Sequence, residues 1–129
     1  RFADRTGLRV QLKVSELPAR LVPEIETAIY RGVQEALTNV ARHAQADEVQ
    51  VRLACASGMV TAWIEDDGRG FDAQAWAEGE GWRQSLGLAG IQERVKLLDG
   101  YVNVISQPGQ GTRIEMALPA RFQPEDGEL

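Results

Sequence analysis

The sequence predicts an α+β fold: a two-layer α/β sandwich in which helices cover one face of a mixed, mostly antiparallel sheet. Five segments alternate apolar and polar residues, the pattern typical of half-buried strands. Two further segments repeat apolar residues about every 3.6 positions, as amphipathic helices do. The 129 residues and the apolar share of 43% fit one domain with a single core.

The first strand and the first helix follow from the N-terminal part of the chain. Residues 8–14 (LRVQLKV) place their apolar side chains on one face, which predicts a strand. Pro23 suits the first turn of the helix that follows a short connector. The apolar stripe of this helix starts at Ile25 and continues to Val40, and we expect the helix to reach about His43.

The middle of the chain predicts a hairpin and then a loop. Residues 48–55 and 59–66 alternate, and the ASG between them is typical of a hairpin turn. The pattern is lost after Phe71, where mixed polarity and glycines predict a mobile loop with one short helix around residues 73–77. A second amphipathic helix follows, with Gly100 as its expected C-terminal stop.

The C-terminal part predicts a second strand pair. Residues 101–106 and 112–119 alternate on either side of the turn sequence QPGQG. The tail 120–129 has no periodicity, so we expect it to be frayed. We therefore expect one domain over residues 1–129 with its core at about 8–119, and strand alternation indicates that the second sheet face is mostly solvated.

Composition and charge narrow the function classes. The net charge of −5, without a long basic run, argues against nucleic acid or an anionic membrane as the main partner. Cys55 is the single cysteine, which excludes an internal disulfide. No apolar run approaches the roughly 20 residues of a membrane span. The chain starts at Arg1 rather than Met, and we expect a piece of a longer protein.

One stripe of the first helix carries polar residues that suit a phosphate or metal site. At about 100° per residue it holds Arg31, Glu35, Asn39, Arg42 and His43. Asn39 borders the apolar face, where an amide needs hydrogen-bond partners or a ligand. An amide oxygen beside a carboxylate suits magnesium, with the cationic residues facing phosphates. For this helix taken alone, a solvated polar face is the better interpretation.

The stretch IEDDGRGF ends a predicted strand in two adjacent acids. Asp66 shares the parity of the apolar residues of its strand and is expected to point to the core side, whereas Asp67 is expected to point to solvent. A desolvated carboxylate must be hydrogen-bonded or shift its pKa, and an amine with two N–H donors, such as that of adenine, would satisfy it. Gly68 and Gly70 would bring backbone close to a flat ligand. A plain Asp/Gly turn remains the alternative.

Two further glycine-rich stretches are candidates. In SLGLAG, Gly87 and Gly90 leave backbone N–H groups uncovered near a helix N-terminus, where an anion is favoured. An ordinary glycine-rich helix entry explains this stretch equally well. PGQGT is typical of a hairpin turn, and its Thr112 offers a side-chain donor.

Taken in order, four of these stretches resemble the ATP-binding catalytic domain of bacterial sensor histidine kinases, which has the GHKL (Bergerat) fold. YRGVQEALTNVARHAQA resembles the N box, DDGRGFD the first glycine box, SLGLAGIQERV the second, and PGQGT the last. The pair QEALTNVARHA and GLAGIQERV is most similar to the nitrate-sensor type. The resemblance covers about residues 23–119, and the four boxes in order are more specific than any one of them.

The resemblance implies a Mg-ATP site with assigned residues. Asn39 would coordinate the magnesium, Glu35 would help to organise metal or water, and Asp66 would accept from the adenine amino group. Further lining residues are carried over as a set: Arg42, His43, Gly68, Gly70, Gly87, Leu88, Gly90 and Thr112. Residues 72–85 would form the ATP lid, including Trp82, with Ser85 where the family often has glycine.

The resemblance also implies an activity: transfer of the ATP γ-phosphate to a histidine on a separate dimerisation domain, in two-component signalling with a response regulator. His43, the sole histidine, belongs to the N box, so the acceptor would lie outside this chain. We expect a monomeric isolated domain, a homodimeric full-length kinase, and a cytoplasmic domain whose parent is either soluble or anchored in the inner membrane. The alternatives are a hydrolysing GHKL ATPase or anti-sigma-type serine kinase, and a degenerate, non-catalytic nucleotide-binding or interaction module.

Overall fold

The computed structural model describes residues 8–70 and 88–124, without the side chains of residues 43, 44, 88 and 89. The elements follow the predicted order. They are β1 (Arg9–Val14), α2 (Pro23–Asn39), a π-helical turn (Val40–Ala44), β2 (Glu48–Ala56), β3 (Met59–Asp66), α5 (Leu88–Leu97), β4 (Tyr101–Ser106) and β5 (Thr112–Pro119). The predicted bounds of the strands and helices are met within a few residues.

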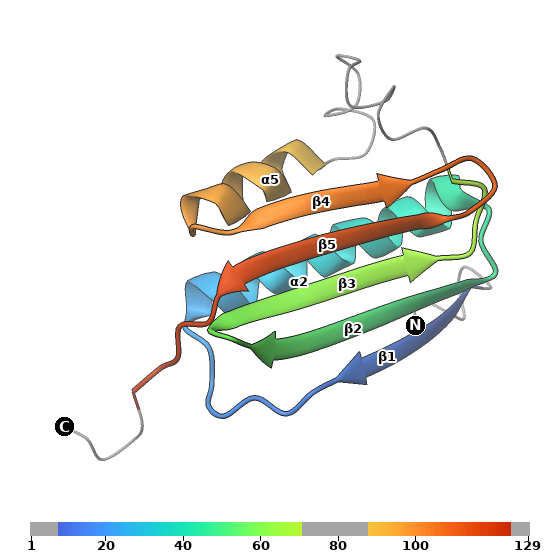
Figure 1. Cartoon of the computed structure of the whole chain (residues 1–129). Coiled ribbons are helices and arrows are strands. Elements are labelled where there is room, and N and C mark those ends of the chain that lie inside the picture. Colours follow the sequence, from blue (N-terminus) through green and yellow to red (C-terminus); the bar gives the residue numbers. More distant parts are fainter. Residues whose placement is uncertain (1–7, 71–87, 125–129) are drawn as a thin grey trace.

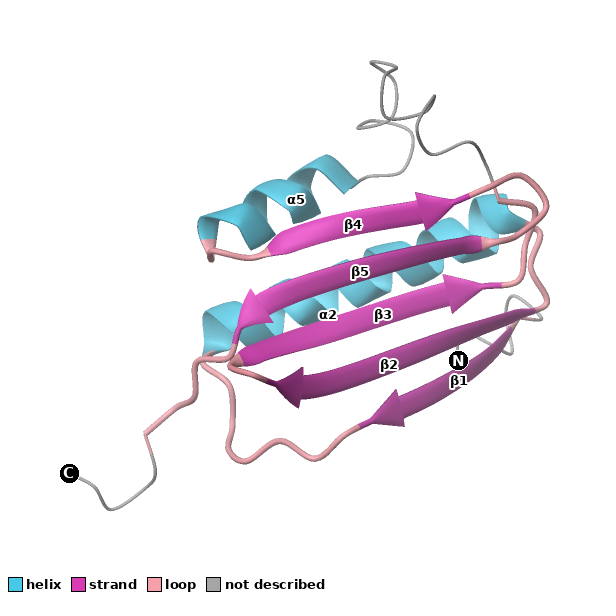
Figure 2. Cartoon of the chain, viewed as in Figure 1, coloured by secondary structure: helices cyan, strands magenta, loops and turns pink. Residues whose placement is uncertain are grey.

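The strands form one five-stranded sheet in the order β1-β2-β3-β5-β4. β1 pairs with β2 in parallel, and the other three pairings are antiparallel. Figures 1 and 2 show α2 and α5 in one layer against a single face of this sheet. The predicted two-layer α+β sandwich with a mostly antiparallel sheet is confirmed.

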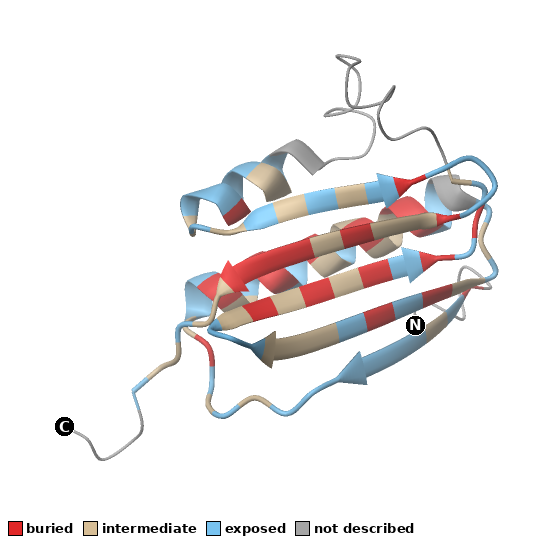
Figure 3. Cartoon of the chain, viewed as in Figure 1, coloured by how far each residue is buried: buried red, intermediate tan, exposed pale blue. Residues whose placement is uncertain are grey.

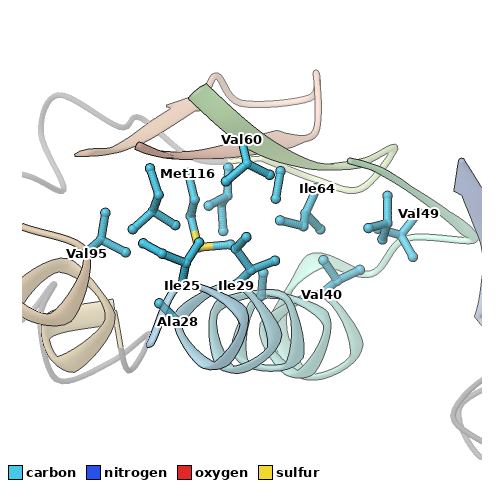
Figure 4. Close-up of a cluster of buried hydrophobic side chains, with 14 of the residues drawn as sticks. Ile25, Ala28, Ile29, Val40, Val49, Val60, Ile64, Val95 and Met116 are labelled. Atoms are coloured by element: carbon cyan, nitrogen blue, oxygen red, sulfur yellow. The ribbon is translucent and has the colours of Figure 1, made fainter. Parts of the chain in front are cut away.

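The core lies between α2 and the centre of the sheet. Val60, Ile64 and Met116 point from the strands toward Ile25 and Ile29 of the helix (Figure 4). Each fully buried side chain of this size stabilises the fold by about 1.5–3 kcal/mol. This packing therefore fixes the position of α2 relative to the end of β3 and the start of β5, where the candidate site lies.

The helical layer leaves one side of the sheet uncovered. Leu12 and Val14 of β1 do share the face of the core strands, as predicted, yet they are 69% and 53% exposed. The reason is that α2 and α5 pack over β3, β4 and β5. Between β1 and α2 this leaves a groove of about 480 Å³ whose lining includes Leu12, Val14 and Tyr30. Exposed and half-buried residues alternate with buried ones along β3 and the first half of β2 (Figure 3), so the opposite face of these strands is exposed or half-buried.

Two local predictions are wrong. Asp99, not Gly100, takes the left-handed conformation that ends α5, with φ of 65°. Gly100 is needed for packing, since a Cβ there would collide with the carbonyl oxygen of Ala117. The tail is also docked as far as the structure describes it: Phe122 bridges to Leu21 and packs against the core, which ties down residues 120–124. In the part of the chain that the structure describes, no helix is long and apolar enough to cross a membrane.

Candidate functional site

Three polar side chains form a row at one end of the sheet. Asp66 ends β3, Thr112 begins β5 and Ser106 ends β4, and the strand register pairs Thr112 with both of the others. Directly opposed residues in a sheet point to the same face, here the face that the helices cover. Asp66 and Ser106 are buried, at 6% and 7% exposure, and Thr112 is half-buried. The row is therefore a polar edge on the core side of the sheet.

The Asp66 carboxyl group is held by backbone donors. Its Oδ1 accepts a hydrogen bond from the Gly68 N–H at 2.8 Å, and the Thr112 N–H also donates to it. Burial is the main cause that raises the pKa of Asp66, opposed by these two bonds and reinforced by the charges of Asp67 and Glu65. The predicted desolvated acid is confirmed, and it has remaining acceptor capacity for a donor-bearing ligand.

Asp67 is exposed, as predicted, but it also has a structural role that the sequence did not suggest. Its Oδ1 accepts from the backbone N–H groups of Asp47 and Glu48, at 3.0 and 3.1 Å. Chiefly the bond from Glu48 lowers the pKa of Asp67. One acid of the pair thus faces the helix-covered side of the sheet, and its neighbour holds the start of β2 through hydrogen bonds.

Two glycines let the loops at this end approach each other. Gly70 has φ of +62°, and a Cβ there would collide with the Gln107 carbonyl oxygen and lie 2.8 Å from that of Gly111. Gly111 has φ of +75°, and a Cβ there would collide with the Asp66 carbonyl oxygen. Only glycine fits both positions without strain. Gly70 was predicted to bring backbone close to a flat ligand, whereas the close approach in the structure is to the β4–β5 loop.

The end of α2 supplies the next group of predicted residues. Asn39 is the last residue of the helix and is 9% exposed, more deeply buried than the predicted border position. Glu35 lies one turn earlier and lines a cleft of about 220 Å³ together with Arg31 and Gly90. Figure 1 shows the end of α2 beside the same sheet end that carries the polar row. The structure thus brings helix and strand candidates to one end of the molecule.

The turn after Asn39 differs from the prediction of a continuous α-helix. Val40–Ala44 is π-helical and ends at Gln45, which is left-handed with φ of 52°. Because a π-turn holds an extra residue, Arg42 and His43 do not keep the angular positions assumed for the polar stripe. Arg42 is exposed. Such turns occur frequently at functional sites.

The remaining candidates lie at or before α5. Gly90 is exposed in its first turn, where backbone N–H groups lack intrahelical partners. A Cβ at Gly90 would meet no described atom within 4 Å, so packing does not require glycine there. The predictions for Gly87, Trp82, Ser85 and the short helix at 73–77 lie outside the described residues, as do the side chains of His43 and Leu88.

Ser106 is a site residue that the sequence reasoning missed. Its hydroxyl donates to the Gly111 carbonyl at 2.9 Å and lies 2.8 Å from the Thr112 hydroxyl. Strand parity would have found it, because Ser106 and Thr112 flank the hairpin loop at positions that face the same side.

The described residues supply one candidate magnesium ligand, and the remaining ligands would have to come from water or phosphate. Within residues 8–70 and 88–124, no group of three or more His, Cys, Asp or Glu side chains could hold a metal ion. The amide oxygen of Asn39 is a hard donor of the type that magnesium uses beside water and phosphate oxygens. The residues therefore fit a metal that arrives with a phosphate ligand.

Comparison with known proteins agrees with this geometry. Residues 24–121 match the family model described as histidine kinase-, DNA gyrase B- and HSP90-like ATPase. The chain is 36% identical, over 92% of its length and 29% of the relative's, to the signal transduction histidine-protein kinase/phosphatase DegS of Brevibacillus brevis. It is 37% identical, over 92% of its length and 33% of the relative's, to the oxygen sensor histidine kinase NreB of Staphylococcus carnosus. The chain thus spans about a third or less of these relatives.

A solved structure shares the fold. The histidine kinase domain of the blue-light activated histidine kinase EL346 from Erythrobacter litoralis superposes with a TM-score of 0.72 at 28% identity. The match covers 92% of this chain and 56% of that one.

Proposed function

Because this chain belongs to the family of histidine kinase-, DNA gyrase B- and HSP90-like ATPases, we propose that it is the Mg-ATP-binding catalytic domain of a sensor histidine kinase. It holds ATP so that the γ-phosphate reaches a histidine on a separate dimerisation domain. The observation that carries this proposal is Asp66: a buried carboxylate at a strand end, held by two backbone donors and flanked by glycine-shaped loops. Its free lone pairs suit the adenine amino group.

The other predicted site residues contact the metal and the phosphates of the nucleotide. Asn39 would coordinate magnesium through its amide oxygen, and Glu35, one helical turn away, would help to organise metal or water. Arg42 and His43 line the phosphates, together with the backbone N–H groups at the start of α5. Magnesium, when bound with the nucleotide, offsets the negative charge of the phosphates.

Phosphoryl transfer needs positioning and charge neutralisation more than covalent chemistry by the protein. This chain accordingly orients the nucleotide, and the accepting histidine belongs to the kinase's dimerisation domain. A response regulator is the expected next acceptor, and the full-length kinase is a homodimer. Names of relatives such as DegS and NreB support this assignment.

Titration calorimetry of ADP with and without Mg²⁺ tests the proposal. Wild-type protein should bind ADP, and Mg²⁺ should tighten that binding. Asn39→Ala should remove the metal dependence while ADP alone still binds. Thr38→Ala is the matched control, because the Thr38 hydroxyl bonds only one turn back within α2, to the Gln34 carbonyl at 3.0 Å. Absence of ADP binding by the wild type at millimolar concentration would contradict the proposal.

A further inference from the structure

We propose that Ser106 is a positioning residue for nucleobase selection: it fixes the Thr112 hydroxyl so that the base pocket presents hydrogen-bond acceptors and no side-chain donor from this row. The inference rests on the proposed function, since it assigns a specificity device to the same nucleotide site. It extends the row of Asp66 and Thr112 by one strand, to the end of β4.

The geometry begins with the register of three strands. Thr112 lies opposite Asp66 on one side and opposite Ser106 on the other, with all three on the helix-covered face. Side chains at directly opposed positions come within about 4.5–5.5 Å at Cβ, close enough for hydroxyl contacts. The Ser106 and Thr112 hydroxyl oxygens are 2.8 Å apart, which is a hydrogen bond.

The number of protons decides the direction of that bond. A serine hydroxyl carries one proton, and Ser106 donates it to the Gly111 carbonyl at 2.9 Å, an atom that can only accept. In the Ser106–Thr112 pair the donor is therefore Thr112. Its single proton points toward β4, away from Asp66, and the oxygen keeps a lone pair for the pocket side.

The row therefore offers only hydrogen-bond acceptors to a bound base. Asp66 offers carboxylate lone pairs and Thr112 offers a hydroxyl lone pair, reached directly or through one water. Adenine carries an exocyclic amine with two N–H donors, which matches two acceptors. A base with a carbonyl oxygen at the same position, such as hypoxanthine, would place that oxygen against the lone pairs of Asp66 and Thr112. Such a base would therefore bind more weakly than adenine.

Gly111 fixes the position of the carbonyl oxygen that accepts the Ser106 proton. Its left-handed backbone and its close approach to the Asp66 carbonyl fix where the Gly111 carbonyl points. Ser106 is buried there at the strand end. The serine proton consequently has a fixed acceptor, and the polarity of the Thr112 hydroxyl does not depend on bound nucleotide.

The test compares dissociation constants of ADP and inosine diphosphate, measured by titration calorimetry. The variants are Ser106→Ala, Thr112→Val and the double substitution. Ser106→Thr is the conservative variant that retains a hydroxyl. Ser15→Ala is the matched control, because the exposed Ser15 hydroxyl also donates to a backbone carbonyl, that of Leu53 at 3.2 Å, outside the site.

We expect Ser106→Ala to lower the preference for ADP over inosine diphosphate by about fivefold, since one directed hydrogen bond is redirected. Ser106→Thr should keep the wild-type preference, and Ser15→Ala should leave it unchanged. In the Thr112→Val background, Ser106→Ala should have no further effect on the preference. Two results would overturn the inference and leave the proposed function standing. One is that Ser106→Ala weakens the binding of both nucleotides equally. The other is that Ser106→Ala lowers the preference just as much in the Thr112→Val background. A wild type that binds neither nucleotide would overturn both.

Discussion

At the scale of residues, the adjacent acids Asp66 and Asp67 show how one peptide step separates two roles. Asp66 faces the core side, and burial raises its pKa. Asp67 faces solvent, and backbone hydrogen bonds, foremost that from Glu48, lower its pKa. Strand parity alone predicted which acid would be buried. It could not predict that Asp67 fastens β2, because that contact joins residues 20 positions apart.

The two pKa shifts predict opposite effects of pH on stability. With a raised pKa, folded Asp66 holds its proton more tightly than the unfolded chain, so its ionisation costs stability as pH rises from 3.8 through the folded pKa. Asp66→Asn should therefore be at least as stable as wild type at pH 7, and this advantage should shrink as pH falls toward 3.8. Urea unfolding at a series of pH values measures it.

Asp67→Asn is the control for that series. The pKa of Asp67 is lowered, so its ionised form stabilises the fold above 3.8, and this contribution is lost as pH falls through the lower folded pKa. The variant should be less stable than wild type at pH 7, with a deficit that fades only in acid. The same pH trend for both variants would contradict the assigned environments.

At the scale of elements, the site depends on how closely α2, α5 and the sheet approach. Gly32 of α2 lies where a Cβ would collide with Met116 of β5, and would be 3.6 Å from Ile91 of α5. Gly90 of α5 has open space instead. Close packing therefore requires glycine at position 32, whereas no steric requirement explains Gly90.

Alanine at each position separates these causes. Gly32→Ala should destabilise the fold by about 1–3 kcal/mol, because overpacking must displace a buried methionine. Gly90→Ala should stabilise it by up to about 1 kcal/mol, since alanine favours an exposed helix. Chemical denaturation gives both values. A weaker ADP affinity of Gly90→Ala, despite the higher stability, would show a functional need for glycine; an unchanged affinity would remove Gly90 from the proposed site.

At the scale of the whole molecule, periodicity was sufficient for the architecture but not for local geometry. Alternation and helical repeats predicted the order of strands and helices and the single helical layer. They could not predict the π-turn after Asn39 or the left-handed Asp99, because both depend on tertiary packing. Strand parity places Ser106 on the same side as Thr112 across the hairpin, but that both lie in one row with Asp66 follows only once three strands are in register.

The sheet end organises the proposed function. Asp66 and Thr112 come from neighbouring strands, and Asn39 comes from the helix that packs across them. In the proposed function, residues 73 positions apart in sequence (Asn39 to Thr112) would therefore serve one nucleotide. A net charge of −5 disfavours an anionic ligand at long range, so the proposed nucleotide binding relies on local donors at this end and on the proposed magnesium. In the proposed function, the fold thus places one buried acid, Asp66, at the base and one amide, that of Asn39, at the metal.

The most direct measurement is the ADP dissociation constant of Asp66→Asn beside that of Asp67→Asn, by titration calorimetry on folded protein. Loss of a hydrogen bond to a charged acceptor should weaken ADP binding by about 10- to 100-fold in Asp66→Asn. Asp67→Asn should bind ADP as wild type does, since Asp67 is exposed and bonded to β2. Wild-type affinity in Asp66→Asn, or equal losses in both variants, would contradict the role of Asp66 as the adenine-reading residue.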